Sequence, residues 1–267
     1  MNLIERVLLL LQEEMERPKA YGWFHLLCIV LTISIIIYLF KIKKRRSEKQ
    51  LKKVLFIYGV IALTLEILKQ ISWSFEYNPL GNIWDYEWYA FPFQLCTTPI
   101  YVSLICLFLR NSKVKKSLLS YMAFITILGS IMTMIIPNSC FTGEILINIH
   151  TMWLHCGSLV VSIYLIISGF VKIDIKSLKN AFIVFLIFVG IALTMNIIIF
   201  NTGILNGETF NMFYISPYFI SSLPVFDFIQ ENVPYLIYLL TYILAIGLGS
   251  FIVFSITKFL EFRCKKM

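Results

Sequence analysis

The stretch FHLLCIVLTISIIIYLFKIKKRRSEKQLKK, from Phe24 to Lys53, joins a run of apolar residues to a run of basic ones. With its flanks, the apolar part reaches roughly 20 residues, the length that a helix needs to cross a hydrocarbon core about 30 Å thick. Backbone inside lipid must satisfy its own hydrogen bonds, so a run of this length must be helical. The stretch therefore predicts a membrane-spanning helix that ends at a basic connection.

Apolar blocks of similar length recur along the whole chain. They fall at residues 20–41, 53–73, 92–110, 117–136, 145–171, 178–200 and 235–258. The chain is 59% hydrophobic and 14% charged, whereas a soluble domain is usually about half apolar and a quarter charged. Strand-length alternating segments are absent from the sequence. We therefore expect an all-α, polytopic transmembrane helical bundle of about seven spans.

The basic residues lie in alternate connections between these blocks. Lys and Arg number eight in residues 41–53, four in 110–116, three in 172–179 and four in 258–266, and none in 74–91, 137–144 or 201–234. Because basic connections stay in the cytoplasm, the N-terminus is expected outside and the C-terminus inside a plasma-membrane protein. The net charge of +8 then reflects topology and contact with anionic lipid, and no nucleic-acid partner is expected.

The bundle has three recognisable parts. Residues 1–19 place apolar side chains at helical spacing with acids opposite, which predicts an amphipathic helix at the outer surface. Residues 20–258 form a single membrane domain, and residues 259–267 a basic cytoplasmic tail. Within the domain, the long aromatic connection 201–234 is expected to fold back over the bundle as a lid. The six cysteines show neither a CxxC pair nor zinc spacing, so no disulfide framework is expected.

Polar side chains inside membrane spans are costly and are therefore candidate functional positions. Counted from the ends of their spans, all of the candidates fall in the outer half of the membrane. They are His25, Glu66, Lys69, Gln94, Cys96, His150, His155 and Asn196, and we add Asn211 from the outer connection. This distribution predicts one polar cavity open toward the outer leaflet and no pore lined from side to side.

Several of these residues also have a purely structural interpretation. Glu66 and Lys69 are three residues apart, so an ion pair on one helix would satisfy both. His25 could place its tip among lipid headgroups, and Asn196 could hydrogen bond to a neighbouring helix. Taken alone, Cys96 would be ordinary packing.

A nucleophilic cysteine needs a base within hydrogen-bond reach, and the chain has three histidines. His150 matches Cys96 in depth, whereas His155 is roughly 7 Å deeper. Because the two histidines are five residues apart on one helix, they cannot both face one cavity directly. Depth favours His150 as the base. A zinc site is disfavoured, because the histidines lack HxxxH spacing and no acid sits beside them.

Five motifs, in order over roughly residues 20–255, carry a resemblance to a known family. They are YGWFHLL around His25, WYAFPFQLCTTPIYV (Trp88 to Val102), the IP–N element at Ile136 to Asn138, INIHTMWLHCGSLVVSIYLIISG (Ile147 to Gly169), and FNMFYISPYF with VPYLIYLL (Phe210 to Leu240). The chain resembles the YwaF-like bacterial integral membrane proteins. These are distantly similar to the transmembrane protein 164 acyltransferases and the androgen-induced membrane hydrolases, which use a Cys or Thr nucleophile and a His on lipid acyl groups.

The resemblance implies roles for individual residues. It implies Cys96 as the nucleophile, His155 as the base within an HG-type element, and His25 as the first-span histidine. His150 stands where relatives tolerate glutamine, so the resemblance favours His155 where depth favours His150. Gln94 replaces a histidine that many relatives carry, which weakens any mechanism with a second ionisable group beside the cysteine.

The favoured hypothesis is a lipid acyltransferase or lipid ester hydrolase at the outer leaflet. Cys96 would form an acyl-thioester with a membrane phospholipid or lysolipid as substrate, and Gln94, Asn196 or backbone N–H groups near Pro92 would stabilise the oxyanion. Two alternatives stay open: a transporter or solute-binding protein, and a non-catalytic receptor or assembly protein whose polar residues only fix packing. No cofactor and no metal are expected.

Overall fold

The computed structural model describes residues 2–42, 47–110, 112–137 and 140–266. Within them, six helices are long and apolar enough to cross a membrane. These are α2 (Trp23–Lys41), α3 (Glu48–Ser74), the continuous run of α5 (Lys113–Tyr121), η2 (Met122–Thr126) and α6 (Ile127–Ile135), then α7 (Ile145–Ile167), α8 (Ile175–Thr202) and α10 (Tyr235–Lys266). The predicted all-α polytopic bundle is confirmed, and the protein is a multi-pass membrane protein. Lys43 to Arg46 of the first basic connection, Asn138 of the IP–N element and Met267 of the tail lie outside the described residues.

The third predicted span, 92–110, is helical only in its inner part. Helix α4 covers Thr98–Phe108, which is 11 residues or about 16 Å at 1.5 Å per residue, too short for a hydrocarbon core. The residues before it form the 3-10 turn η1 (Trp88–Ala90) and an irregular segment, 91–97. The described chain thus has one half-length helix where a seventh full span was expected. Irregular backbone at this depth is tolerated where protein surrounds it, and α3 packs along α4.

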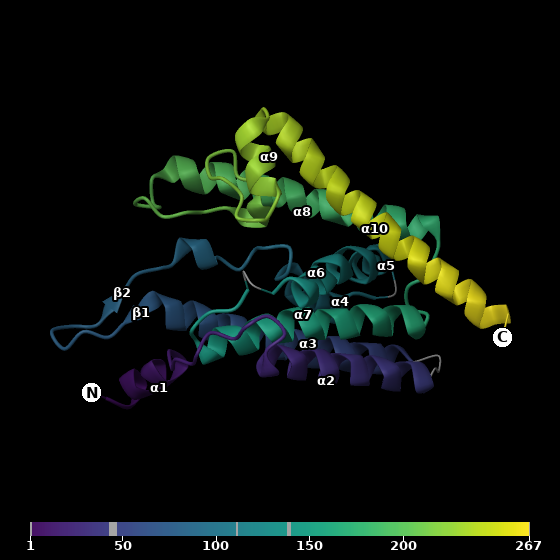
Figure 1. The fold of residues 1–267 in the computed structure, drawn as a ribbon, viewed down its shortest axis with the longest axis horizontal. Helices are drawn as coiled ribbons and strands as arrows, with labels where there is room; N and C mark the ends of the chain where they lie inside the picture. Colours follow the sequence, from purple (N-terminus) through teal and green to yellow (C-terminus); the bar gives the residue numbers. More distant parts are fainter. Residues whose placement is uncertain (1, 43–46, 111, 138–139, 267) are drawn as a thin grey trace.

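The helices form three layers (Figure 1). One layer holds α2, α3 and α7, in which α7 packs against both α2 and α3, and another holds α8, α9 (Phe226–Asn232) and α10. The shorter helices α4, α5 and α6 lie between these layers (Figure 1). The C-terminus and the α7–α8 connection lie at one end, and the N-terminus lies at the other (Figure 1). With basic connections inside, the N-terminal end is the outer end.

A five-residue π-helical turn, η2, interrupts the run from α5 to α6. All five of its side chains are buried. The backbone carbonyl of Met122 accepts hydrogen bonds from the hydroxyl of Ser162 (2.6 Å) and from the hydroxyl of Thr126 (2.8 Å). Hydroxyl groups of α7 and of the turn itself therefore satisfy the Met122 carbonyl. Single π-helical turns inside α-helices are frequent at functional sites.

The N-terminal region is helical over fewer residues than the predicted 1–19. Helix α1 spans Leu3–Leu11 and starts at a capping box between Asn2 and Glu5. After α1 the chain is extended and crosses the outer ends of α3 and α7, with the Met15 N–H bonded to the Gly143 carbonyl (2.7 Å). We call residues 12–22 the strap. Its backbone bonds to the connection before α7 and to the start of α7, and the helix predicted over residues 1–19 therefore ends at Leu11.

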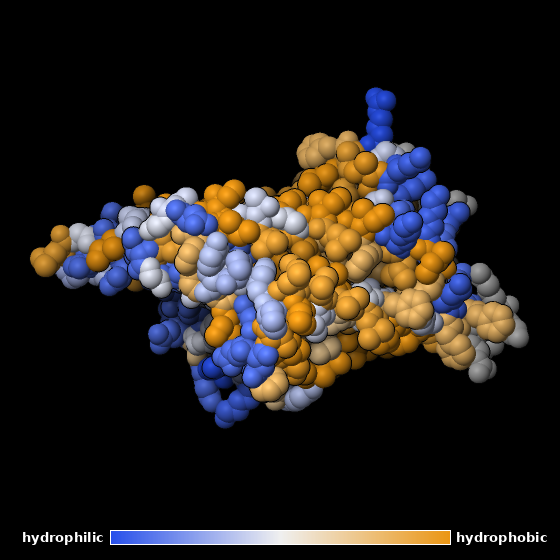
Figure 2. All heavy atoms as spheres, turned by 90° about the horizontal axis from the view of Figure 1, so that it is seen from above, coloured by the Kyte–Doolittle hydropathy of each residue, from blue (hydrophilic) through white to orange (hydrophobic). Residues whose placement is uncertain are grey.

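A short hairpin projects beside α1 at the outer end. Strands β1 (Phe75–Glu76) and β2 (Ile83–Trp84) pair antiparallel, and Asn82 donates to the Glu5 carboxylate at 3.0 Å. Figure 2 shows the apolar side chains gathered over the middle of the molecule, with more hydrophilic residues toward its ends. That distribution matches a bundle surrounded by lipid, because lipid-facing helix surfaces are apolar.

Candidate functional site

Three ionisable residues form a buried group, the charged cluster, between α3 and α7. One carboxylate oxygen of Glu66 lies 2.6 Å from Lys69 Nζ, and the other lies 2.7 Å from His150 Nε2. Glu66 is 3% exposed, and both partners are buried too. The predicted Glu66–Lys69 pair is present, but the expectation that no acid lies beside the histidines is wrong. It failed because the packing of α3 on α7 brings Glu66 to His150.

The charged cluster is connected to the outer surface through side chains of α3. The Lys69 ammonium lies 5.7 Å from the centre of the Trp73 ring. The Trp73 indole N–H in turn donates to both Glu144 oxygens at 3.0 Å. Burial raises the pKa of Glu144, with a further rise from Glu14 in the strap, and the Trp73 bond opposes this. This series of contacts therefore ends at the Glu144 carboxyl group, and Glu14 of the strap pairs with the backbone of Glu144.

Gln70, which the sequence analysis did not select, links the cluster to the segment before α4. Its amide donates to Glu66 (2.8 Å) and to the Ala90 carbonyl (2.6 Å), and its oxygen accepts from the Tyr86 hydroxyl (2.7 Å). Gln70 is four residues from Glu66 and thus on the same helix face. That spacing was a signal in the sequence that could have identified it.

Cys96 lies in the irregular segment 91–97, directly before α4. Pro92 lacks a donor for a helix, and the Thr97 hydroxyl both accepts from the Gln94 N–H and donates to the Gln94 carbonyl at 2.9 Å. These bonds hold a turn around Cys96, whose side chain is half-buried. The thiol lies within electrostatic range of Lys69 and Glu66. The charges of the cluster are therefore close enough to act on the Cys96 thiol.

The two histidines of α7 differ in their surroundings. His150 is bonded to Glu66 through Nε2, whereas the buried His155 ring makes no hydrogen bond to a described residue. The Tyr58 ring packs on Gly157, where an added Cβ would lie 3.0 Å from it, and the Tyr58 hydroxyl is within electrostatic range of Cys96. Tyr58 thus packs on α7 two residues after His155 and lies within electrostatic range of Cys96. Among the described residues Cys96 has no hydrogen bond to either histidine, and their pairing stays a prediction.

Three amide side chains form a second polar group, the amide network, which joins the segment 91–97 to α8 and the outer connection. Gln94 donates to the Asn211 carbonyl (2.9 Å) and accepts from the Phe213 N–H (2.8 Å). Asn196 donates to the Met212 carbonyl (3.0 Å) and accepts from the Met212 N–H (2.7 Å). Asn196 thus bonds to loop backbone, where an interhelical bond was one expectation.

Asn211 completes the network within the outer connection 201–234. Its side chain accepts from the Ser216 N–H (2.8 Å) and donates to the carbonyls of Phe219 and Ile220 (both 3.2 Å). Phe213 has φ of 59°, a left-handed conformation that non-glycine residues adopt mainly where their surroundings enforce it. The amides thus hold a strained loop against the segment that carries Cys96.

The structure places His25 apart from both polar groups. Its Nδ1 accepts from the Tyr21 N–H at 3.0 Å, and its ring packs edge-on against Phe141 with centroids 5.6 Å apart. His25 is fully buried, so it does not place its tip among headgroups. It orders the entry to α2, and none of its described contacts joins it to Cys96, His150 or His155.

Below Cys96 and His155, the core contains hydroxyl pairs that the sequence analysis did not identify. Thr98 and Tyr121 are bonded at 2.6 Å, and Ser130 and Ser158 are bonded at 2.6 Å. Single Ser, Thr and Tyr residues are common in apolar spans, so the sequence carried no signal for these pairs. They give the centre of the bundle polarity without charge.

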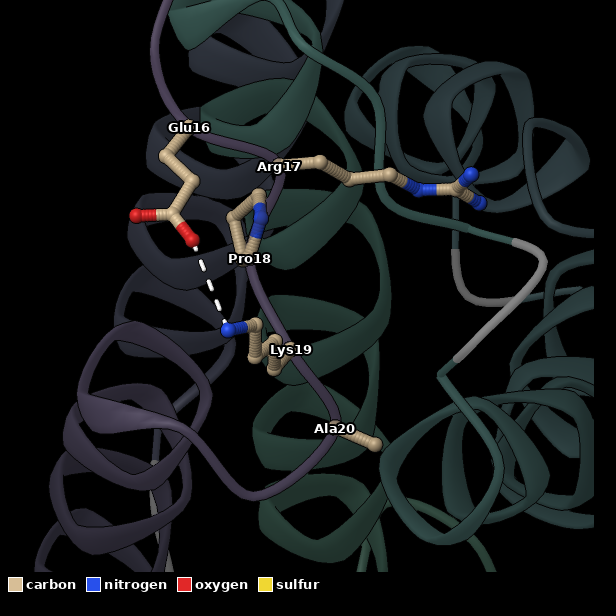
Figure 3. Close-up of a pocket in the computed structure, with 5 residues that line it drawn as sticks. All are labelled: Glu16, Arg17, Pro18, Lys19 and Ala20. Carbon is tan, nitrogen blue, oxygen red and sulfur yellow. Dashed lines mark ion pairs between the residues drawn. The ribbon is translucent and has the colours of Figure 1, made fainter.

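Two surface hollows lie at the outer end of the described molecule, and neither is lined by Cys96, His150 or His155. One follows residues 16–20 of the strap, where the Glu16 and Lys19 side chains face each other at 3.5 Å (Figure 3). The other is formed by the outer connection, α9 and the start of α10. The cavity expected to open toward the outer leaflet stays a prediction. No group of three His, Cys, Asp or Glu residues in the described ranges is placed to hold a metal ion.

Comparison with known proteins gives one match. A family model described as the TMEM164 family matches residues 20–254, which include both polar groups and Cys96. Neither the curated proteins nor the solved structures give a match.

Proposed function

Since this chain belongs to the TMEM164 family, we propose that it is a lipid acyltransferase or lipid ester hydrolase that forms an acyl-thioester on Cys96. One observation carries the proposal: the thiol lies in irregular backbone within electrostatic range of a buried lysine, and the buried ring of His155 makes no hydrogen bond to a described residue. The proposal includes the YwaF-like bacterial branch of the family, a location in the plasma membrane, and a phospholipid or lysolipid as substrate.

In the first half-reaction, His155 takes the proton of the Cys96 thiol and the thiolate attacks the ester carbonyl of a lipid. The tetrahedral intermediate expels the alcohol oxygen of the lysolipid, which receives the proton from His155. Cys96 is then acylated. In the second half-reaction, a lysolipid hydroxyl or water attacks the thioester while His155 accepts its proton. The thiol leaves with that proton, which regenerates the starting enzyme.

A thiolate in apolar surroundings is disfavoured by desolvation, so the thiol needs a cation close by. Lys69 provides the positive charge within electrostatic range of Cys96. Glu66 holds the ammonium at 2.6 Å and His150 completes the pairing of the carboxylate. The charged cluster thus keeps a lysine oriented in a buried site, and in the proposed mechanism it stabilises the thiolate.

Backbone N–H groups are the best candidates for the oxyanion hole. The Leu95 N–H has no hydrogen-bond partner among the described residues, and the Cys96 N–H interacts only with the Cys96 side chain itself. By contrast, Gln94 and Asn196 already donate to the Asn211 and Met212 carbonyls. Free donors next to the nucleophile suit a developing oxyanion because they need no rearrangement during the reaction. Of the donors considered from the sequence, the structure supports the backbone over the side-chain amides.

The proposal is tested by searching for the acyl adduct. The protein is purified from its membrane and digested under conditions that preserve thioesters, and the Cys96 peptide is examined by mass spectrometry. Phospholipid turnover is measured in parallel for the wild type, Cys96→Ala, His155→Gln and His150→Gln. Cys106→Ala is the matched control. Cys106 lies on α4, the helix that directly follows the segment with Cys96, and it is fully buried in the core.

We expect a fatty-acyl mass on Cys96 that hydroxylamine removes, and no turnover in Cys96→Ala. Loss of general-base catalysis in His155→Gln should lower turnover about 100-fold or more, with a smaller effect in His150→Gln. Because palmitoylation could produce the same mass, turnover must fall together with the adduct. Absence of both across a broad lipid panel would refute the thioester mechanism and favour the binding and structural alternatives.

A further inference from the structure

The hollow of the outer connection has a chemistry of its own. It has a volume of about 220 Å³ and is lined by Pro217 to Ile220 of the connection, Gln230 and Glu231 of α9, and Tyr235 of α10. Drug-sized pockets span about 300–1,000 Å³, so this hollow suits a small group and excludes an acyl chain. It shares none of its lining residues with Cys96 or the charged cluster.

The aromatic walls of the hollow are fixed in place. Tyr218 stacks on Phe200 with ring centroids 3.7 Å apart and planes 7° apart. The Tyr235 hydroxyl donates to the Ile215 carbonyl at 2.7 Å. The Gln230 amide is already occupied, because it makes three bonds to the backbone of the connection. Little rotamer entropy would be lost when a ligand enters, which favours binding.

Glu231 is the ionisable residue of this lining and has no counter-charge. Its exposed carboxylate makes no ion pair and no hydrogen bond to a described residue. The sequence contains no Lys, Arg or His between Lys179 and Lys258, so the outer connection and both flanking helices bring no cation to it. Among the described residues no basic side chain pairs with Glu231, so the carboxylate is available to a cationic ligand.

We propose that this hollow binds an alkylammonium group, such as the trimethylammonium of a choline compound. Aromatic rings attract such cations through their negative faces, and a neighbouring carboxylate adds a direct charge. With no basic residue near, the lining offers nothing for a phosphate. The ligand can be a lipid headgroup or a free solute, since both present the same cation. The inference does not depend on the proposed enzyme activity, and failure of either leaves the other standing.

The test is calorimetric titration of the full chain, purified in an uncharged detergent, with choline and with its neutral isostere 3,3-dimethylbutanol. We expect choline to bind and the isostere not to bind. Glu231→Gln should weaken choline binding about tenfold, or about 1.4 kcal/mol, and Tyr218→Leu should weaken it by a similar factor. Glu76→Gln is the control, because it removes the same charge from the exposed hairpin.

Equal heats for choline and the isostere, or unchanged choline affinity in Glu231→Gln, would overturn the proposal. Because Glu231 is exposed, its substitution should not prevent folding, so the test does not depend on Tyr218→Leu alone. Nanodiscs identify the source of the cation. Competition by phosphatidylcholine, with full choline binding in phosphatidylglycerol, identifies a headgroup site. Undiminished choline binding in both lipids identifies a site for a free solute.

Discussion

The charged cluster and the amide network are two buried polar groups that are held together by different means. In the cluster, one carboxylate joins side chains of two regular helices, α3 and α7. In the network, Gln94 and Asn196 bond to backbone groups of a loop. Backbone that is not helical must find partners when water is absent. The comparison teaches that the buried charges lie within electrostatic range of the candidate nucleophile, whereas the buried amides supply hydrogen-bond partners to backbone that is not α-helical.

The largest expected effect comes from removing the centre of the charged cluster. In Glu66→Ala, Lys69 and His150 lose their shared partner while both stay buried. Breaking a buried ion pair from one side typically costs about 3–5 kcal/mol, so we expect a loss of this size in the free energy of unfolding. Denaturant unfolding in mixed micelles measures it. Glu76→Ala on the exposed hairpin is the control, and equal stability of the two variants would show that the cluster is not an ion pair in solution.

A smaller loss is expected on the amide side. Asn196→Leu leaves the Met212 N–H without a partner in a fully buried position, while the Met212 carbonyl keeps only the Ile215 N–H at 3.4 Å. A buried unsatisfied group costs about 1–3 kcal/mol. We expect about 2 kcal/mol after local relaxation. Asn201→Leu on the same helix serves as the control, because its exposed amide donates only to the helix and to the Tyr218 hydroxyl. The comparison fails if both substitutions have the same effect.

Gln94 tests whether the network positions Cys96. In Gln94→Leu the bonds to Asn211 and Phe213 are lost, so the segment that carries Cys96 should shift and Cys96-dependent turnover should fall about tenfold. Loss should appear in kcat with little change in KM, because Gln94 need not touch the substrate. Gln94→Glu keeps an acceptor for the Phe213 N–H and should be less affected. Full activity in Gln94→Leu would mean that the network only stabilises the loop.

The smallest effect concerns pH and Glu144, where the charged cluster reaches the strap. Burial raises the pKa of this carboxyl above 4.5. The folded state therefore favours the protonated form, and that contribution is present below pH 4.5 and lost as pH rises through the folded pKa. We expect Glu144→Gln to become slightly more stable than the wild type across that window. Unfolding curves between pH 4 and 7 test it, and parallel curves for the two proteins would contradict it.

The sequence predicted the helical bundle, which the structure confirms, whereas the orientation in the membrane and the roles of the polar residues stay predictions. Long apolar blocks must be helices in lipid, and Glu66 or Lys69 within such blocks is conspicuous because charge is rare there. The partners were not predictable. Whether Glu66 meets His150 depends on how α3 packs on α7, which no local pattern encodes.

The structure of the irregular segment 91–97 was also not predictable from the local sequence. Residues 92–97 are apolar enough to resemble the start of a span, but Pro92, the Thr97 bonds and the distant backbone partners of Gln94 make them non-helical. The sequence selected Gln94, Asn196 and Asn211 as candidate positions, and the structure shows the two asparagines buried and Gln94 half-buried. Their common role in holding the loop could not be inferred, because their bonds lead to backbone groups of other segments.

The half-length helix α4 has a consequence for how the protein enters its membrane. With 11 residues, α4 would partition weakly into a bilayer by itself, and the segment before it would present bare peptide groups to lipid. It must therefore insert together with α3, along which it packs. The backbone partners of Gln94 lie 117 and 119 residues later in the chain. During synthesis, the surroundings of Cys96 are consequently completed only after α8 and the outer connection have been translated.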